Sequence, residues 1–141
     1  DDMSSLWVMP EGAAPMIWKE VTGIAFTPTN FAISLVGEDV EIFFDFNCGV
    51  NAENYIIPEA VYYVNDDEGT GFNFNLENEY DLRIGGVKTK LKSGTMEIKH
   101  ISGGYDIYVD VESIHNHKVQ VRYTGPIGEI DIMGRPITNP E

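Results

Sequence analysis

An alternation of apolar and polar residues with a period of two runs through most of this chain, and it constrains the possible folds more than any other feature. In a β-strand, successive side chains point to opposite faces, so this period gives a segment one face for a core and one for water. The spacing that a helix requires, i, i+3, i+4, i+7, is not sustained over the same region. The segments that alternate are 31–35, 40–46, 72–76, 80–84, 96–100, 105–111 and 119–123.

This pattern predicts an all-β fold, an antiparallel meander of about nine strands. Such a meander forms either a flattened barrel or a two-sheet sandwich, and the alternation fits both. We expect residues 1–20 to form an N-terminal arm or linker. Residues 21–133 are predicted to form a single β domain, and residues 134–141 a C-terminal tail.

The composition excludes several classes of protein. A chain of 141 residues with 43% hydrophobic residues can bury one core, and it is too apolar for a disordered acidic protein. A net charge of −14 repels phosphate backbones, so we expect no nucleic-acid partner. Cys48 is the single cysteine, which precludes an intrachain disulfide, and its place beside a Phe-rich segment predicts a packed thiol. No apolar run is long enough for a transmembrane helix.

Several segments, taken in order, resemble a group of uncharacterised secreted β-domains and lipoproteins of Bacteroidetes-type gut bacteria. The resemblance covers roughly residues 30–128 and rests on four places: Asp45 and Phe46 at the end of an aromatic strand, Pro58 and Tyr62, Gly94 and Thr95, and finally Tyr123, Gly125, Pro126 and Ile127.

What this resemblance implies is a location rather than an activity. It implies export to the periplasm or cell surface, as a lipoprotein whose signal has been removed and whose anchor lies upstream of this sequence. It implies no catalytic residue and no ligand. Ala60 stands where such domains usually carry glycine, so a bulge that the glycine would support is not expected here.

The segment "SIHNHKV" holds two of the three histidines, His115 and His117. With a carboxylate from elsewhere in the chain, this pair would form a weak candidate zinc site. His100 lies at the far end of the preceding strand, roughly 25 Å away, and cannot join them. We favour a simple strand connection in which Asn116 takes a left-handed turn conformation.

No other segment carries a strong signature of catalysis or metal binding. Asp66 and Asp67 are weak candidates for calcium ligands, but a solvated hairpin tip explains them better. The GxSxG, phosphate-loop and HExxH motifs are missing. Carboxylate pairs are inevitable among 23 acidic residues and therefore indicate nothing by themselves. We predict neither an enzyme nor a cofactor.

Four aromatic residues are the best candidates for a binding surface. Trp7 and Trp18 lie in the arm, where they would either bind a ligand or fold back over a barrel end. Phe43 and Tyr108 point outward by alternation, and exposed rings stack on sugars or fill a partner's pocket.

These observations favour a non-catalytic exported or lipid-anchored module that binds a glycan, lipid or protein partner, or that takes part in surface assembly. One alternative is a small-ligand carrier with an apolar cavity inside the barrel. A glycan-acting enzyme that uses carboxylates ranks last.

Overall fold

The computed structural model describes residues 18–141 and the backbone of Trp7 and Val8, and the fold is all-β, as predicted. A single short 3₁₀ turn, η2 (Glu53–Tyr55), is the one helical element in the described residues, so no helix there could span a membrane. The strands are β1 (Trp7–Val8), β2 (Glu20–Thr27), β3 (Asn30–Val36), β4 (Val40–Asn47), β5 (Ala60–Tyr63), β6 (Asn73–Phe74), β7 (Leu82–Ile84), β8 (Val87–Thr89), β9 (Leu91–Ile101), β10 (Gly104–Ser113), β11 (Lys118–Gly125) and β12 (Gly128–Asp131).

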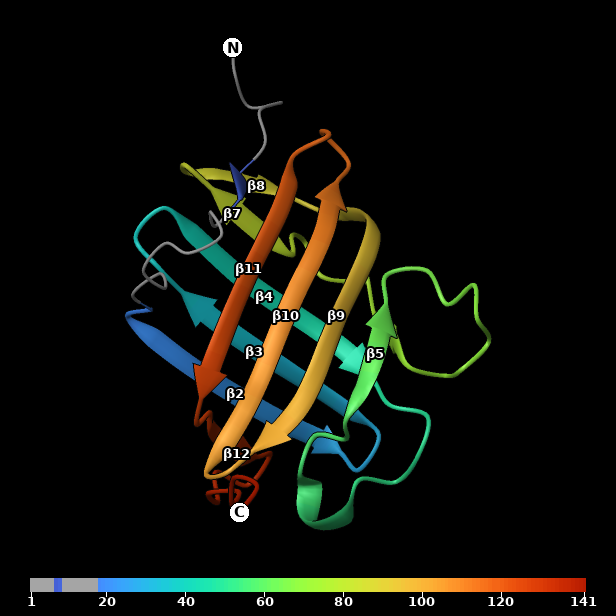
Figure 1. The fold of residues 1–141 in the computed structure, drawn as a ribbon, viewed down its shortest axis with the longest axis vertical. Coiled ribbons are helices and arrows are strands. Elements are labelled where there is room, and N and C mark those ends of the chain that lie inside the picture. Colours follow the sequence, from blue (N-terminus) through green and yellow to red (C-terminus); the bar gives the residue numbers. More distant parts are fainter. Residues whose placement is uncertain (1–6, 9–17) are drawn as a thin grey trace.

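One continuous sheet curls back on itself to form two layers (Figure 1). Its strands are hydrogen-bonded in the order β1-β11-β10-β9-β5-β6-β4-β3-β2-β12, with the β7–β8 hairpin attached to β4. The layer of β9, β10 and β11 crosses in front of the layer of β2, β3 and β4 (Figure 1). Within the described residues the sheet ends at β1 and β12, so the result is an open, flattened barrel.

The core lies between the two layers, and alternation places its side chains. In β4, Ile42, Phe44 and Phe46 are fully buried, while Phe43 points outward. Aromatic rings fill much of the interior, with Phe46 packed edge-on against Tyr62 at 4.9 Å between ring centroids. Burial of each such side chain contributes about 1.5–3 kcal/mol, so the inward face of every long strand adds to stability.

Cys48 belongs to this core, as its sequence context predicted. Its thiol is buried and donates to the carbonyl oxygen of Val50 at 3.0 Å. Burial raises the pKa of the Cys48 thiol, so this group is held in its neutral, poorly nucleophilic form.

The alternation of segments 80–84 and 96–100 predicts that Tyr80 and His100 share the inward faces of their strands, but both lie outside the core. His100 is exposed because the end of β9 runs past the core, and its Nε2 lies 2.7 Å from the carbonyl oxygen of Ile57. Tyr80 precedes β7 and contacts the outward ring of Phe43 edge-on, at 6.0 Å. In both cases the sequence alternation extends beyond the part of the strand that packs on the core.

Three strand pairs are parallel and so depart from a simple antiparallel meander: a local pair between β5 and β6, with Tyr63 opposite Asn73, and two long-range pairs. β1 adds to β11 in parallel, with Trp7 opposite Val119. β12 adds to β2 in parallel, with Ile130 opposite Ile24. Each of the two long-range pairs joins segments that are distant in sequence, so local turn signals do not reveal them.

Candidate binding face

The outward side of β9, β10 and β11 carries an array of polar side chains that is continuous across the three strands. We call it the polar face. The register aligns its side chains in four rows across the three strands. The rows are Ser93–Glu112–Lys118, Thr95–Asp110–Gln120, Glu97–Tyr108–Arg122 and Lys99–Asp106–Thr124.

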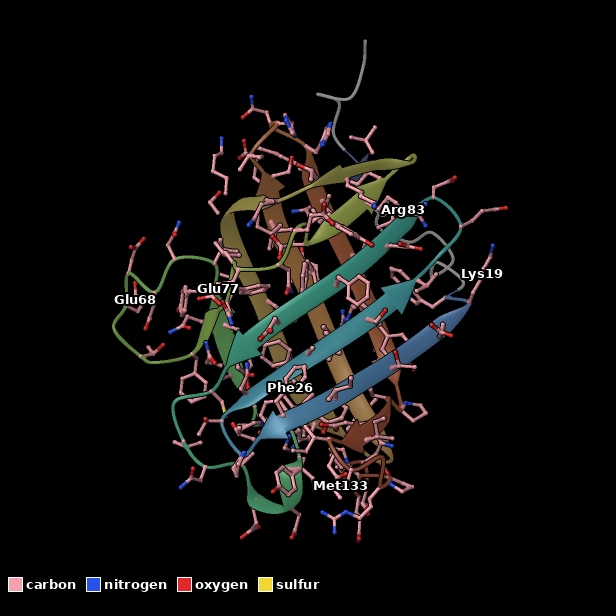
Figure 2. The ribbon with its side chains drawn as sticks, turned by 180° about the vertical axis from the view of Figure 1, so that it is seen from behind. Lys19, Phe26, Glu68, Glu77, Arg83 and Met133 are labelled. Atoms are coloured by element: carbon pink, nitrogen blue, oxygen red, sulfur yellow. The ribbon has the colours of Figure 1, made fainter. Side chains whose placement is uncertain are left out.

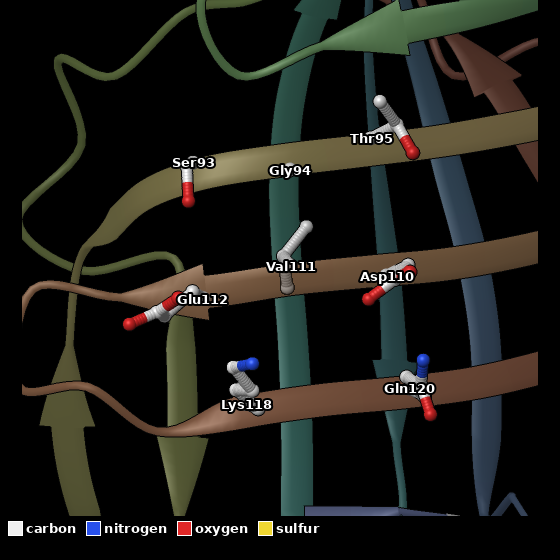
Figure 3. Close-up of a pocket in the computed structure, with 8 residues that line it drawn as sticks. All are labelled: Ser93, Gly94, Thr95, Asp110, Val111, Glu112, Lys118 and Gln120. Carbon is white, nitrogen blue, oxygen red and sulfur yellow. The ribbon is translucent and has the colours of Figure 1, made fainter.

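Two open hollows lie on the polar face. The larger, of about 540 Å³, covers the first two rows, and Figure 3 shows its lining side chains on three adjacent strands. The smaller, of about 290 Å³, covers Tyr108 and Arg122 with their neighbours. The register places the two hollows two residues apart along the strands, so they form successive parts of one surface.

Gly94 is one of the residues that line the larger hollow. Its φ of 122° is rarely adopted by other residues, and a Cβ there would lie 2.3 Å from the carbonyl oxygen of Asp110. Across the β9–β10 ladder Gly94 lies opposite the buried Val111, and both residues line the hollow together with Ser93 and Thr95 (Figure 3). The absence of a side chain at Gly94 therefore permits a close approach of the β9 and β10 backbones.

Ion pairs fix part of the polar face. The guanidinium of Arg122 binds Asp106 through two hydrogen bonds, of 2.9 and 2.6 Å. These bonds lower the pKa of the Asp106 carboxyl, so it is ionised at neutral pH. Lys92 lies 3.1 Å from Glu112 at the other end of the face. These two ion pairs hold their four side chains in defined positions, whereas Lys118 in the first row has no ion pair among the described residues.

The middle of the polar face differs from its two ends, because its polar side chains do not bind one another. Within residues 18–141, the side chains of Thr95, Asp110 and Gln120 make no side-chain hydrogen bond or ion pair, although they form one row across the strands. A carboxylate accepts hydrogen bonds, an amide both donates and accepts, and a hydroxyl does either. This row therefore presents donors and acceptors to a ligand with hydroxyl groups.

Tyr108 supplies the flat surface next to that row. It is 39% exposed and lies between Glu97 and Arg122 in the adjacent row. An exposed phenol ring has an apolar face that packs against the C–H face of a sugar, and a hydroxyl that hydrogen-bonds. Of the four aromatic candidates from the sequence, Tyr108 is the one that the structure places on the polar face.

Phe43 is outward as predicted, but it lies on the opposite layer, on the outer side of β4. Its ring is 43% exposed and contacts Tyr80. The two outward aromatics are therefore on opposite sides of the molecule and cannot contact one ligand of ordinary size.

The structure describes neither tryptophan side chain on the polar face. Trp18 is half-buried and packs against the core just before β2, with its indole nitrogen buried and without a partner among the described residues. The backbone of Trp7 forms part of β1, whereas its side chain lies outside the described residues. The rest of the predicted arm, residues 1–6 and 9–17, is likewise outside them.

His115 and His117 lie at the tip between β10 and β11. Asn116 between them has a φ of 67°, the left-handed turn conformation that the sequence predicted. The two rings are 6.3 Å apart, and Nδ1 of His115 lies 3.0 Å from the hydroxyl of Thr89. His117 is buried, and burial, followed by the effect of His115, lowers its imidazole pKa. The arrangement is a capped turn with one histidine packed inside.

The carboxylate of Asp66 binds backbone groups of its own loop. Its carboxylate accepts hydrogen bonds from the backbone N–H groups of Thr70 and Gly71, at 3.0 and 2.8 Å, and these bonds lower its pKa. Asp67 is exposed beside it. Across the described residues, no group of three or more His, Cys, Asp or Glu side chains is placed to hold a metal ion.

The sequence identified Tyr108 but not the hollow beside it. Asp110 and Gln120 are ordinary outward residues of alternating strands, and nothing in their local sequence distinguishes them. The one available signal is Gly94, since a glycine within a strand pattern indicates a bulge or a close approach of two backbones.

Comparisons with protein-family models, with curated proteins and with solved structures give no match to this chain. The polar face is therefore interpreted from its own geometry and chemistry.

Proposed function

We propose that the protein is a non-catalytic binding module whose polar face holds a segment of a glycan chain. The observation that carries this proposal is the open hollow around Thr95, Asp110 and Gln120, with the exposed ring of Tyr108 beside it. Sugars offer many hydroxyl groups and apolar C–H faces, and this surface offers the complement of both.

The shape of the face favours a chain over a single small molecule. From Ser93 to Lys99, six residues of extended strand span roughly 20 Å. The hollows are open along this length rather than enclosed, whereas sites for small molecules bury most of the ligand surface. An extended ligand that contacts several rows fits this geometry best.

The charge of the protein restricts the range of possible ligands further. Lys118 lines the larger hollow without an ion pair among the described residues, but Lys92 and Arg122 are paired, and the net charge of −14 repels strongly anionic polymers. We therefore propose a neutral glycan. The carrier alternative has less support, because fully buried rings such as Phe31, Phe44 and Tyr105 occupy the barrel interior.

Export to the periplasm or cell surface, with a lipid anchor upstream, belongs to the same proposal. Its support is the sequence resemblance to secreted β-domains of Bacteroidetes-type bacteria, together with a surface suited to extracellular polysaccharides.

Binding to a glycan array, followed by titration calorimetry on each positive glycan, tests the proposal. We expect Tyr108→Ala to weaken affinity about tenfold or more, because the stacking surface is lost. Phe43→Ala is the matched control, since it removes an equally exposed ring from the opposite layer, and it should bind like the wild type.

If the wild type binds no neutral glycan, or if Phe43→Ala weakens binding as much as Tyr108→Ala does, the polar face is not a glycan site. Binding that is restricted to anionic polysaccharides would contradict the charge argument.

A further inference from the structure

The last strand and the tail that follows it form a strap across the open side of the barrel. The strap consists of β12 and residues 132–140. β12 pairs with β2, and the tail folds back along the other edge of β12, where the N–H of Ile137 donates to the carbonyl oxygen of Glu129 at 2.9 Å. The tail ends where the N–H of Gly103 donates to the carbonyl oxygen of Pro140 at 2.8 Å.

The alternation of β12 is reversed relative to β3, β4 and β10, whose buried positions are mainly apolar. Glu129 and Asp131 point inward and are buried, whereas Ile130 and Ile132 point outward and are exposed. Ile127, just before the strand, is fully buried and is fixed by two hydrogen bonds to the side chain of Asn139. The N–H of Glu129 donates to the carbonyl oxygen of Ile127 at 2.9 Å, so a tight turn at Gly128 leads from the buried Ile127 to the buried Glu129.

Among the residues that the structure describes, no group stabilises a charge on Glu129. Its side chain is 4% exposed, and its Oε2 atom is buried without a hydrogen-bond partner among the described residues. It lies above Gly23 of β2, where a Cβ would be 3.5 Å from its Cγ. A buried carboxylate without a partner is one of the most costly arrangements in a protein interior.

The ionisable groups around Glu129 do not compensate for its charge. β10 contributes Tyr105, a buried phenol whose oxygen accepts a hydrogen bond from Ile57. The inward positions of β2 carry Gly23 and Ala25, which do not ionise. On the strap itself, Asp131 is bound to Arg135, so that cation is already paired.

We propose that the strap is a pH-dependent latch, which closes on β2 when Glu129 binds a proton and loosens as Glu129 ionises. In the closed form the carboxyl is neutral and tolerates burial. In the open form Glu129 reaches water, and the β2 edge and the end of the core near Tyr105 are uncovered. This latch is separate from the polar face and does not depend on the glycan proposal.

The direction of the pH dependence follows from linkage. Burial raises the pKa of Glu129 to about 8, whereas an exposed glutamate titrates near 4.5. Between these values the open form has released its proton and the closed form has kept it, so rising pH favours opening. The opening equilibrium constant should increase about tenfold per pH unit in this window and level off above a pH of about 8.

Hydrogen exchange of the full chain, measured from about pH 5 to about pH 9 and corrected for intrinsic rates, tests this proposal. We expect the protection of residues 128–140 to fall by orders of magnitude with rising pH and then reach a plateau. Protection of β9 and β10 should change much less. The carboxyl carbon of Glu129, followed by NMR, should titrate far above the ordinary range of glutamate.

Two substitutions separate the latch from a merely structural strap. Glu129→Gln keeps the size of the side chain and removes its charge, so protection of the strap should no longer depend on pH. Glu129→Leu should remove the pH dependence in the same way, and it leaves no buried amide that needs a hydrogen-bond partner. The control is Asp131→Asn on the same strand. It should weaken the strap at every pH, because its loop hydrogen bonds are lost, while the pH dependence persists.

The proposal fails if strap protection is independent of pH in the wild type, or if Glu129→Gln retains the wild-type dependence. It also fails if all strands lose protection together over the same pH range, since that result would indicate global unfolding rather than local release.

Discussion

The two outer surfaces of the barrel are built from similarly alternating strands but differ in chemistry. The polar face of β9–β11 carries paired charges, hydroxyls and one exposed ring around a hollow. On the opposite layer, Ile24 of β2 lies beside Ile130 of β12, with Phe26 farther along β2 (Figure 2). We call Ile24, Phe26, Ile130 and Ile132 the apolar edge. Alternation determines which side chains face outward, but the outward residues themselves determine what each surface can bind.

A glycine on each surface gives the largest expected contrast. Gly94→Val on the polar face would place a Cβ 2.3 Å from the carbonyl oxygen of Asp110 at a positive φ. We expect a loss of about 3 kcal/mol or more in the free energy of unfolding, from backbone strain and overpacking together. Denaturant unfolding measures this loss.

Gly128→Ala is the counterpart in β12, where an added Cβ would meet the carbonyl oxygen of Val21 at 3.5 Å, an ordinary contact. It should change the free energy of unfolding by less than about 1 kcal/mol. Equal losses from the two substitutions would show that the glycine of the polar face has no special role.

Loss of the central carboxylate of the polar face should have the next largest effect. Asp110→Ala removes the acceptor that lacks a partner among the described residues, and we expect glycan affinity to fall roughly tenfold or more, about 1.5–3 kcal/mol. Calorimetric titration measures the change. Asp39→Ala removes an exposed negative charge from the β3–β4 turn and controls for net charge; if it weakens binding equally, the effect is electrostatic and not specific to the face.

Substitutions in the apolar edge should change surface hydrophobicity and stability rather than glycan affinity. The double substitution Ile24→Thr and Ile130→Thr removes a cross-strand apolar pair, with an expected cost of about 1 kcal/mol in stability. Retention on a hydrophobic-interaction column should decrease, and glycan affinity should stay unchanged. A change in glycan affinity would mean that the two surfaces are coupled.

The smallest effect is expected at the ion pair of the polar face. Arg122→Ala should cost about 0.5 kcal/mol at neutral pH, because the guanidinium is more than half exposed. The folded state lowers the pKa of Asp106, so this contribution exists above the ordinary aspartate range and is lost as pH falls through the lowered pKa. Unfolding curves of both proteins should converge in strong acid; a difference that persists there would rule out the ion pair as its cause.

The sequence predicted the parts of this structure that depend on local alternation. The all-β class, the inward residues of β4 and the outward positions of Phe43 and Tyr108 all follow from a period of two. The hollow at Gly94 depends on the register between β9 and β10, which the period does not fix.

The inward orientation of the Glu129 side chain was even harder to predict from the sequence. Hydrophobicity alone would place Ile130 in the core, but in the structure Glu129 is buried and Ile130 is exposed. The parallel pairing of β12 with β2 adds a contact between opposite ends of the chain, beyond the reach of local patterns.

The pairing of β12 with β2 also determines the order in which the strands of the sheet can pair. Thr22 and Gly128 meet across the β2–β12 ladder, so β2 keeps an unpaired edge during synthesis until the last strand has emerged. Contacts of this sequence separation form late and slow folding. A nascent chain therefore keeps this edge of β2 unpaired until β12 has been synthesised.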